Sequence, residues 1–346
     1  YTADDIIELS DRDHVRLRTS VYLGSTHPTE YTIPLLAAND IAVKEVTFVP
    51  AVMKALNEII DNSLDEFTHI KSRVKLLKFD ASPTTGKYTI GDNGRGIPID
   101  LKPGGKHTPE VALSRLKSGR NFTDDKEVGV IGQNGVGSAC TNYCSSEFEV
   151  TIHRDQKKYY QKFVEGAAKI SKPKITTDTG SKPGTEITLQ LDPTVFVDVS
   201  IPEEVVYNRA LEIAMTNPDV TVDYNGERIR FKQGFAEYIE RVADGKNFWR
   251  FTVDEPNIQA EFFVIPEAFP DDTERMFTWV NSSYLYDGGK CNTQFFNAFF
   301  DRVLTTLEPA ARKSKCKITR SDVKSGVAVF ANIKLQNPEY DSQSKT

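Results

Sequence analysis

Carboxylate and amide side chains recur at steps of four along one segment of the chain. Glu58, Asn62 and Glu66 would share one face of a helix, opposite an apolar face. Two further carboxylates, Asp61 and Asp65, are expected beside that polar face. A carboxylate can take a proton from water, and an amide oxygen can bind Mg²⁺ without competing for that proton. The spacing favours a base and a cation ligand in a pocket, although a solvated helix face has the same pattern.

A second candidate segment, residues 91–98, reads Gly-Asp-Asn-Gly-Arg-Gly-Ile-Pro and follows a strand-like run. Asp-Asn-Gly by itself indicates a turn. The additional glycine and the Ile-Pro that follows are more than a turn needs. Glycines allow a flat ligand to approach the backbone, and Asp92 can accept a hydrogen bond from an exocyclic amine.

A third segment, residues 129–138, reads Gly-Val-Ile-Gly-Gln-Asn-Gly-Val-Gly-Ser and leads into a predicted helix. Backbone N–H groups at the start of a helix can bind an anion, although a glycine-rich stretch alone is weak evidence for phosphate. The chain contains neither GxxxxGK[ST] nor GxGxxG. A P-loop and a Rossmann cofactor site are therefore disfavoured.

Hydrophobic periodicity predicts the elements that position these segments. In the N-terminal part we expect a helix over 51–69, strands over 74–79 and 88–91, and a helix that begins near Gly137. Thr26–Pro50, with three prolines, is interpreted as a long connection. Residues 101–138 are weakly periodic, and irregular stretches of that length usually serve a function.

Strand-like runs and helical patterns alternate in the rest of the chain. The expected strands are 148–153, 158–164, 184–191, a hairpin over 220–231 that turns at Asn225-Gly226, 248–253, 260–265, 276–280 and 327–335. The expected helices are 202–216, 234–243 and 293–307. We place a domain boundary after Asp244, which predicts one domain over 1–244 and a second over 245–346.

Composition sets limits on the class of protein. The 346 residues suggest two domains, and 39% hydrophobic with 27% charged residues is typical of a globular protein rather than a disordered one. No apolar run is long enough for a membrane span, and no signal peptide is visible, so we expect a cytoplasmic protein. A formal charge of −6 argues against nucleic-acid binding over the whole surface. The four cysteines lack zinc-ligand spacing and are expected to be reduced and partly buried.

Taken in order, the three segments resemble the motifs of the GHKL ATPases, a group that includes type IIA topoisomerases, MutL repair proteins, histidine kinases and a heat-shock chaperone. Residues 58–66, 92–98 and 132–137 match the first three motifs, and Gly184-Thr185 matches the fourth. The resemblance implies an α+β fold: a GHKL (Bergerat) ATP-binding α/β sandwich followed by a ribosomal-S5-like transducer domain.

Within that group the chain is similar to type IIA topoisomerases over essentially its whole length. His14–Gly24 resembles their opening segment, and Trp279–Asn281 with Gly288-Gly289 resembles part of their transducer. Residues 337–346 resemble their Gln-Thr-Lys loop, although Ser344 replaces the threonine. Gly-Gln-Asn-Gly-Val-Gly favours the eukaryotic and T4-like phage enzymes, and the T4-like phage large subunits resemble the chain most. Lys290 and Cys291 replace a common Thr-His pair, so no role is assigned to them.

The resemblance implies a role for each matching residue. Glu58 would be the general base, Asn62 would ligate Mg²⁺, and Asp92 would accept a hydrogen bond from the adenine amino group. Lys345 would contact the γ-phosphate, assisted by Gln343, because phosphoryl transfer needs positioning and charge neutralisation. The other implied ATP contacts are Glu66, Gly94, Arg95, Gly96, Ile97, Asn121, Gln133, Asn134, Gly135, Val136, Gly137, Ser138 and Thr185. Arg95 and Glu66 would pair beside the adenine or form a plain surface ion pair.

The implied activity is that of an ATP-hydrolysing gate that pairs with a second copy of itself and captures DNA for strand passage. No segment resembles the tyrosine-bearing and acidic parts that cleave DNA, so these are expected in domains or subunits outside the chain.

Two alternative functions stay open. A MutL-like repair ATPase shares the fold, but the Gln-x-Lys loop after Asn-Pro favours a topoisomerase. A nucleotide-dependent dimerisation module with little turnover is the other, and the set Glu58, Asn62 and Lys345 argues against it. A separate basic stretch, interpreted as a solvated face or a patch that faces DNA, comprises Arg312, Lys313, Lys315, Lys317 and Arg320.

Overall fold

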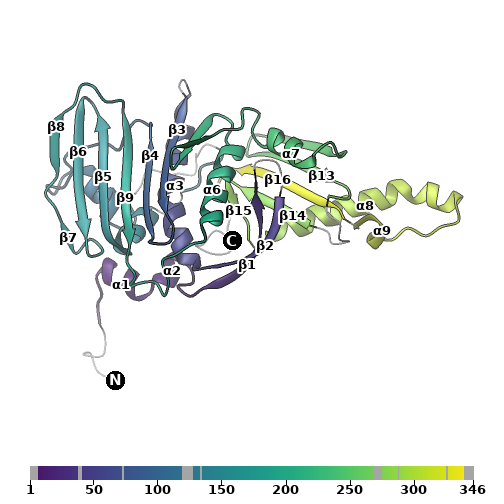
Figure 1. Ribbon diagram of the computed structural model, residues 1–346, viewed down its shortest axis with the longest axis horizontal. Helices are drawn as coiled ribbons and strands as arrows, with labels where there is room; N and C mark the ends of the chain where they lie inside the picture. The colour runs from purple at the N-terminus through teal and green to yellow at the C-terminus, as the bar shows by residue number, and fades with distance from the viewer. Residues whose placement is uncertain are drawn as a thin grey trace.

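The computed structural model describes residues 7–37, 41–71, 74–118, 128–132, 135–268, 275–286, 288–324 and 326–338. Over these residues the molecule is elongated, with a large sheet at one end and a smaller sheet toward the other (Figure 1). None of the helices in the described ranges is both long and apolar enough to cross a membrane.

The large sheet has nine strands in the order β11-β10-β3-β4-β9-β5-β6-β7, and β8 pairs with β6. Its strands are β3 (Lys75–Ser82), β4 (Lys87–Asp92), β5 (Ser145–Arg154), β6 (Lys157–Val164), β7 (Lys169–Ile170), β8 (Lys174–Thr177), β9 (Gly184–Leu191), β10 (Val220–Tyr224) and β11 (Glu227–Ile229). Only β10 and β3 pair in parallel among these strands. The predicted hairpin is confirmed, with Asn225 and Gly226 both at positive φ, as a two-residue type I′ turn requires.

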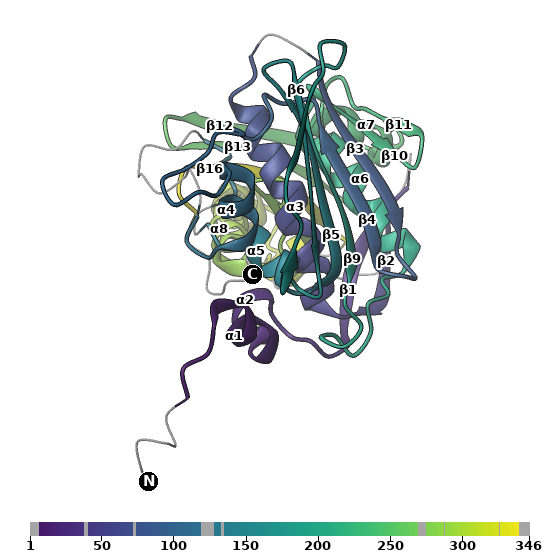
Figure 2. The ribbon, with the colours of Figure 1, turned by 90° about the vertical axis from the view of Figure 1, so that its left-hand side faces the viewer.

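Helices cover one face of the large sheet, as Figure 2 shows. They are α3 (Pro50–Thr68), α4 (Thr108–Ser114), α5 (Gly137–Tyr143) and α6 (Glu203–Thr216). The predicted 51–69 helix is α3, which starts with Pro50, a residue that suits the first helical turn. Its apolar face, including Leu56 and Ile60, is fully buried, so the opposite face is left for polar residues.

The interpretation of Thr26–Pro50 as a long connection is wrong. After α1 (Asp11–Leu17) and α2 (Thr19–Leu23), β1 (Thr29–Leu36) and β2 (Ile41–Phe48) form an antiparallel two-stranded sheet. Pro34 lies opposite Val43 in this small sheet, where few ladder hydrogen bonds are lost to a proline. The stretch 101–138, which is predicted to be irregular, contains the helix α4. Helix α5 starts at Gly137, where a helix is predicted to begin.

The smaller sheet has five strands in the order β12-β13-β16-β14-β15. They are β12 (Trp249–Glu255), β13 (Ile258–Ile265), β14 (Arg275–Val280), β15 (Ser283–Tyr284) and β16 (Ala328–Leu335). On one face α7 (Phe235–Ala243) packs Phe235 against Phe263. On the other face α8 (Gly289–Lys313) stacks Phe295 on Phe262. Helix α8 is longer than the predicted 293–307, and its C-terminal part extends away from the sheet (Figure 1). Helix α9 (Arg320–Lys324) follows it, before β16.

A buried cluster of charges joins the large-sheet part to the smaller sheet. The Arg209 side chain is 4% exposed and donates from Nε to Asn57 Oδ1 at 2.8 Å and from Nη1 to the Ser282 carbonyl. Asp61 and Glu212 approach the same guanidinium at 3.6 Å. Burial raises the pKa of Glu212. Buried charges need such partners, so this cluster ties α3 and α6 to the turn that leads into β15.

Candidate nucleotide site

The carboxylate of Glu58 lies against the first residue of α5. A Cβ built at Gly137 would stand 1.6 Å from Glu58 Oε2, so only glycine fits while Glu58 keeps this position. Glu58 also pairs with Lys54 one turn earlier on α3, and both side chains are largely buried, at 12% and 6% exposure. The candidate base is thus held between its own helix and the start of the helix that follows the glycine-rich segment.

Asn62, one turn after Glu58, faces the same helix start. Its Nδ2 donates to the Glu58 carbonyl at 2.8 Å and to Ser138 Oγ at 2.7 Å, while its Oδ1 bonds to none of the described residues. The residue is exposed, and the described ranges hold no group of three or more His, Cys, Asp or Glu residues that could bind a metal. One amide oxygen suits Mg²⁺ that is held mainly by phosphates and water.

Asp92, the last residue of β4, is the second candidate contact. Gly94 N donates to its Oδ1 at 2.8 Å, and Ser63 Oγ donates to its Oδ2 at 3.1 Å. Burial, with a smaller contribution from the neighbouring Glu66 carboxylate, raises the pKa of Asp92 to about 6 despite these donors. A further hydrogen-bond donor would stabilise the charged form of this buried carboxylate, and the amino group of adenine is such a donor.

The expected Glu66–Arg95 pair forms. Arg95 Nε donates to Glu66 Oε1 at 2.8 Å, Nη2 donates to Oε2 at 3.0 Å, and the Arg95 backbone N–H adds a third bond to Oε1 at 2.8 Å. A Cβ at Gly94 would lie 2.4 Å from Glu66 Cγ and 2.5 Å from Asp92 Oδ1. Gly94 is therefore needed to let both carboxylates close around this turn.

The fourth motif supports the second one from the adjacent strand. Asp92 pairs with Thr185 in the β4–β9 register, and Thr185 Oγ1 accepts from Ile97 N at 3.2 Å. A Cβ at Gly184 would come within 2.2 Å of the Asp92 carbonyl oxygen. Gly96 has a φ of +78°, and a Cβ there would lie 2.9 Å from the His153 carbonyl oxygen. These close approaches explain the glycines of the two motifs.

Asp61 and Asp65 lie in the protein interior instead of beside the polar face, at 2% and 3% exposure. Each carboxylate has a partner that the sequence did not predict. Asp61 faces Arg209, and Asp65 accepts from Ile131 N at 2.7 Å and from Gly132 N at 2.8 Å. Asp65 therefore fixes the start of the glycine-rich segment to α3.

Some predicted contacts cannot be placed. Those that lie outside the described residues are Asn121, Gln133, Asn134, Gln343 and Lys345, and their roles stay predictions. Among the described ones, Val136 is the N-cap of α5, and Gly135 has a φ of +61°. Gly137 and Ser138 meet Glu58 and Asn62 as described above. The structure thus brings the first motif together with the third and, through Glu66 and Arg95, with the second, which in turn meets the fourth.

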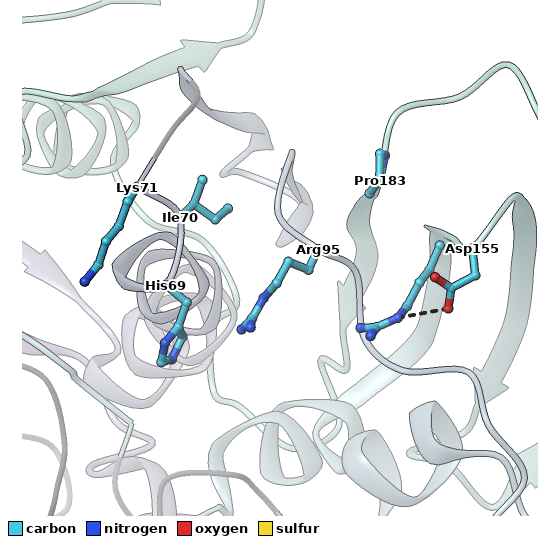
Figure 3. Close-up of a pocket in the computed structure, with 7 residues that line it drawn as sticks. His69, Ile70, Lys71, Arg95, Asp155 and Pro183 are labelled. Atoms are coloured by element: carbon cyan, nitrogen blue, oxygen red, sulfur yellow. Dashed lines mark hydrogen bonds and ion pairs between the residues drawn. The ribbon is translucent and has the colours of Figure 1, made fainter.

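A pocket of about 500 Å³ opens beside the second motif (Figure 3). In Figure 3, Arg95 lies between His69, at the end of α3, and Asp155, in the β5–β6 turn. The other lining residues are Ile70, Lys71, Arg154 and Pro183. Neither Glu58 nor Asn62 lines it, so this pocket is not the place where phosphates would meet the candidate base.

Sequence reasoning missed several residues that shape the site. Lys54 precedes Glu58 by four residues, a spacing that signals a possible ion pair on a helix. Ser63 had no such signal, because its partner Asp92 lies 29 residues away. Arg209 has one local partner, Glu212 on the same helix, but its other partners lie at least 73 residues away in the chain. Contacts of this kind depend on tertiary packing.

Comparisons with known proteins agree with this geometry. Residues 49–195 match the family of histidine kinase-, DNA gyrase B- and HSP90-like ATPases, and residues 234–346 match DNA gyrase B. A type 2 topoisomerase chain of Aquifex aeolicus (strain VF5) is 27% identical over 358 residues, which cover all of this chain and 42% of that protein. DNA topoisomerase 2 of Drosophila melanogaster is 28% identical over 356 residues, which cover 97% of this chain and 24% of that protein.

Solved structures share the fold. The ATPase region of Saccharomyces cerevisiae topoisomerase II has a TM-score of 0.83 at 22% identity, over 99% of this chain and 89% of that one. The ATPase and transducer domains of DNA topoisomerase II from Balamuthia mandrillaris have a TM-score of 0.85 at 23% identity, over 100% of this chain and 89% of that one. The chain spans only about two fifths or less of the two relatives named above. The chain is an α+β GHKL ATPase domain followed by a gyrase B transducer domain, an ATP-hydrolysing module like that of type IIA topoisomerases.

Proposed function

We propose that this region acts as an ATP-operated gate. Two copies pair when ATP binds, trap a DNA segment between them, and separate after hydrolysis and product release. Nucleotide drives such a cycle only if it stabilises the paired state more than the open one. The observation that carries the proposal is the meeting of Glu58, Asn62 and the start of α5 at one place, which joins a base, a cation ligand and a glycine-rich segment.

Each residue has a proposed role in hydrolysis. Glu58 takes a proton from the attacking water, and Asp92 accepts from the adenine amino group. Asn62 offers its Oδ1 to Mg²⁺, which would neutralise phosphate charge when bound. Lys345 contacts the γ-phosphate with help from Gln343, and the segment around Gly135 to Ser138 contacts the phosphates.

The remaining proposals concern the larger enzyme. Because the chain covers about two fifths or less of the relatives reported above, DNA cleavage and strand passage are assigned to domains or subunits outside it. An origin among T4-like phage enzymes, action in the cytoplasm and a domain boundary after Asp244 stay predictions. The separate five-stranded sheet that begins with β12 supports that boundary.

Solution mass tests the gate directly. Light scattering in the presence of Mg²⁺ should give a monomer without nucleotide and a dimer with a non-hydrolysable ATP analogue. A Glu58→Ala variant should still dimerise with ATP but should not hydrolyse it. A chain that binds the analogue and stays monomeric contradicts the gate. A chain that dimerises without measurable turnover favours a dimerisation module instead.

A further inference from the structure

The turn between β14 and β15 reaches from the smaller sheet to the base of the glycine-rich segment. Asn281 and Ser282 form this turn with φ values of +46° and +67°, and they are 1% and 4% exposed. Asn281 Nδ2 donates to the Val130 carbonyl at 3.1 Å and to the Leu335 carbonyl at 3.1 Å. Its Oδ1 accepts from Leu335 N at 2.8 Å. One buried amide thus links the end of β16 to a backbone group outside the smaller sheet.

The segment that Asn281 contacts is held from two sides. On the side of the smaller sheet, Gly129 N also donates to the Leu335 carbonyl at 3.2 Å. On the other side, the Asp65 carboxylate of α3 accepts from Ile131 N and Gly132 N. Residues 129–132, the first part of the glycine-rich segment, are therefore fixed between α3 and the end of β16.

This arrangement is more than a generic contact between two domains. The Val130 carbonyl and the Leu335 backbone groups would lose their side-chain partner if Asn281 lacked its amide, and an unsatisfied buried polar group is costly. Relief of that cost requires the backbone of 129–132 to move. Asp65, which holds residues 131 and 132, lies on the same helix as Asn62. A shift of residues 129–132 therefore changes their position relative to Asn62, the candidate cation ligand.

We propose that Asn281 is a positioning residue for phosphate binding. In the proposed role, Asn281 does not touch the nucleotide. Its amide sets the backbone path of residues 129–132, and this path determines where the glycine-rich segment meets α3. The proposal rests on the proposed function, because it takes that segment to be the phosphate contact. Coupling of this kind is reciprocal, so bound triphosphate would in turn bias the end of β16.

Replacement of Asn281 by glycine tests the proposal, because glycine adopts a φ of +46° without strain and removes the short side chain that carries the amide. Asn225→Gly is the matched control. Asn225 also has a positive φ of +47°, and its amide accepts from Ala81 N at 2.8 Å and donates to the Ala81 carbonyl at 3.2 Å. It lies in the β10–β11 hairpin, in a contact that does not involve 129–132.

The readout separates positioning from stability. Both variants should lower the melting temperature, but only Asn281→Gly should weaken binding of a non-hydrolysable ATP analogue with Mg²⁺, by about tenfold. Adenosine, which lacks phosphates, should bind both variants like the parent. If Asn281→Gly fails to fold, Asn281→Asp is the second variant. It keeps the acceptor for Leu335 N, lacks the donor for Val130, and should show the same selective loss.

Three outcomes count against the inference, and only the third also contradicts the proposed function. An unchanged analogue affinity in a folded Asn281 variant overturns the proposal and leaves the gate function intact. Equal losses for the analogue and for adenosine also overturn it, because they indicate a general disturbance. A parent chain that binds no triphosphate at all contradicts the proposed function, and this inference falls with it.

Discussion

Glu58 Oε2 occupies the space that a side chain at position 137 would need, since a Cβ on Gly137 would come within 1.6 Å of it. The position of the candidate base therefore requires a glycine as the first residue of α5. Gly137→Ala should displace the carboxylate and lower ATP turnover about 100-fold, because a shift of about 1 Å in a catalytic group has an effect of that order. Steady-state turnover with Mg²⁺-ATP measures it.

Gly180→Ala is the control for this substitution, because nothing lies within 4 Å of a Cβ at Gly180. It should leave turnover unchanged. Equal turnover in Gly137→Ala and the parent would show that Glu58 is free to move aside without loss, which would argue against its role as the base.

Removal of the base itself should separate binding from chemistry. Glu58→Gln keeps the shape of the side chain but cannot take a proton, so turnover should fall at least about 100-fold while affinity for an ATP analogue stays within about threefold. Turnover and equilibrium binding, measured on the same preparation, check this. A glutamine variant that hydrolyses ATP at the parental rate would exclude Glu58 as the base.

Asp92 should reduce stability in the absence of nucleotide. Because burial raises its pKa to about 6 in the folded chain, the folded state binds more protons than the unfolded state between about pH 4 and pH 6. The free energy of unfolding is therefore highest while Asp92 is protonated, and it falls as the pH rises from about 4 through about 6. Asp92→Asn should unfold with a higher free energy than the parent at pH 7, by at most about 3 kcal/mol, and the difference should vanish near pH 4.

The same carboxylate predicts a pH dependence of binding. In the parent, affinity for an ATP analogue should fall as the pH drops below about 6, because the acceptor for the adenine amino group becomes protonated. Asp92→Asn should lose at least about tenfold in affinity at pH 7 and should show a flatter pH profile. Denaturant titrations and calorimetry at several pH values test both statements. A variant that is less stable than the parent at pH 7 and binds ATP normally contradicts them.

Lys345, although outside the described residues, carries a prediction about the transition state. Lys345→Ala should lower kcat more than it weakens binding of the ATP analogue, because its charge is proposed to act on the γ-phosphate during transfer. Comparison of kcat with the dissociation constant tests this. A loss of affinity with an unchanged kcat would place Lys345 in ground-state binding only.

The basic stretch at the far end of α8 is exposed and projects from the rest of the described chain (Figure 1). Arg312 and Arg320 already pair with Glu308 and Asp301, which leaves the lysines as the better probes. A triple change of Lys313, Lys315 and Lys317 to Gln should leave basal ATP turnover unchanged and weaken any stimulation by DNA, most clearly at low salt. An unchanged response to DNA would mean that this stretch is only a solvated face.

The sequence alone was sufficient for the motifs and for most elements that carry them. The helix with Glu58 and Asn62, the strand that ends at Asp92 and the Asn225-Gly226 hairpin all follow from local patterns of apolar residues and turn residues. Local patterns failed at β1 and β2, because three prolines suggested a connection where a two-stranded sheet tolerates one of them.

Tertiary structure decided which of these residues meet and which are buried. By their positions in the helical pattern, Asp61 and Asp65 resemble ordinary surface carboxylates. In the structure they are interior groups, paired with Arg209 and with the backbone amides of residues 131 and 132. The role proposed for Asn281 likewise depends on contacts 54 and 151 residues away in the chain. Local periodicity reports which side of a helix or strand is apolar, whereas the partner of a buried polar group depends on how distant elements pack.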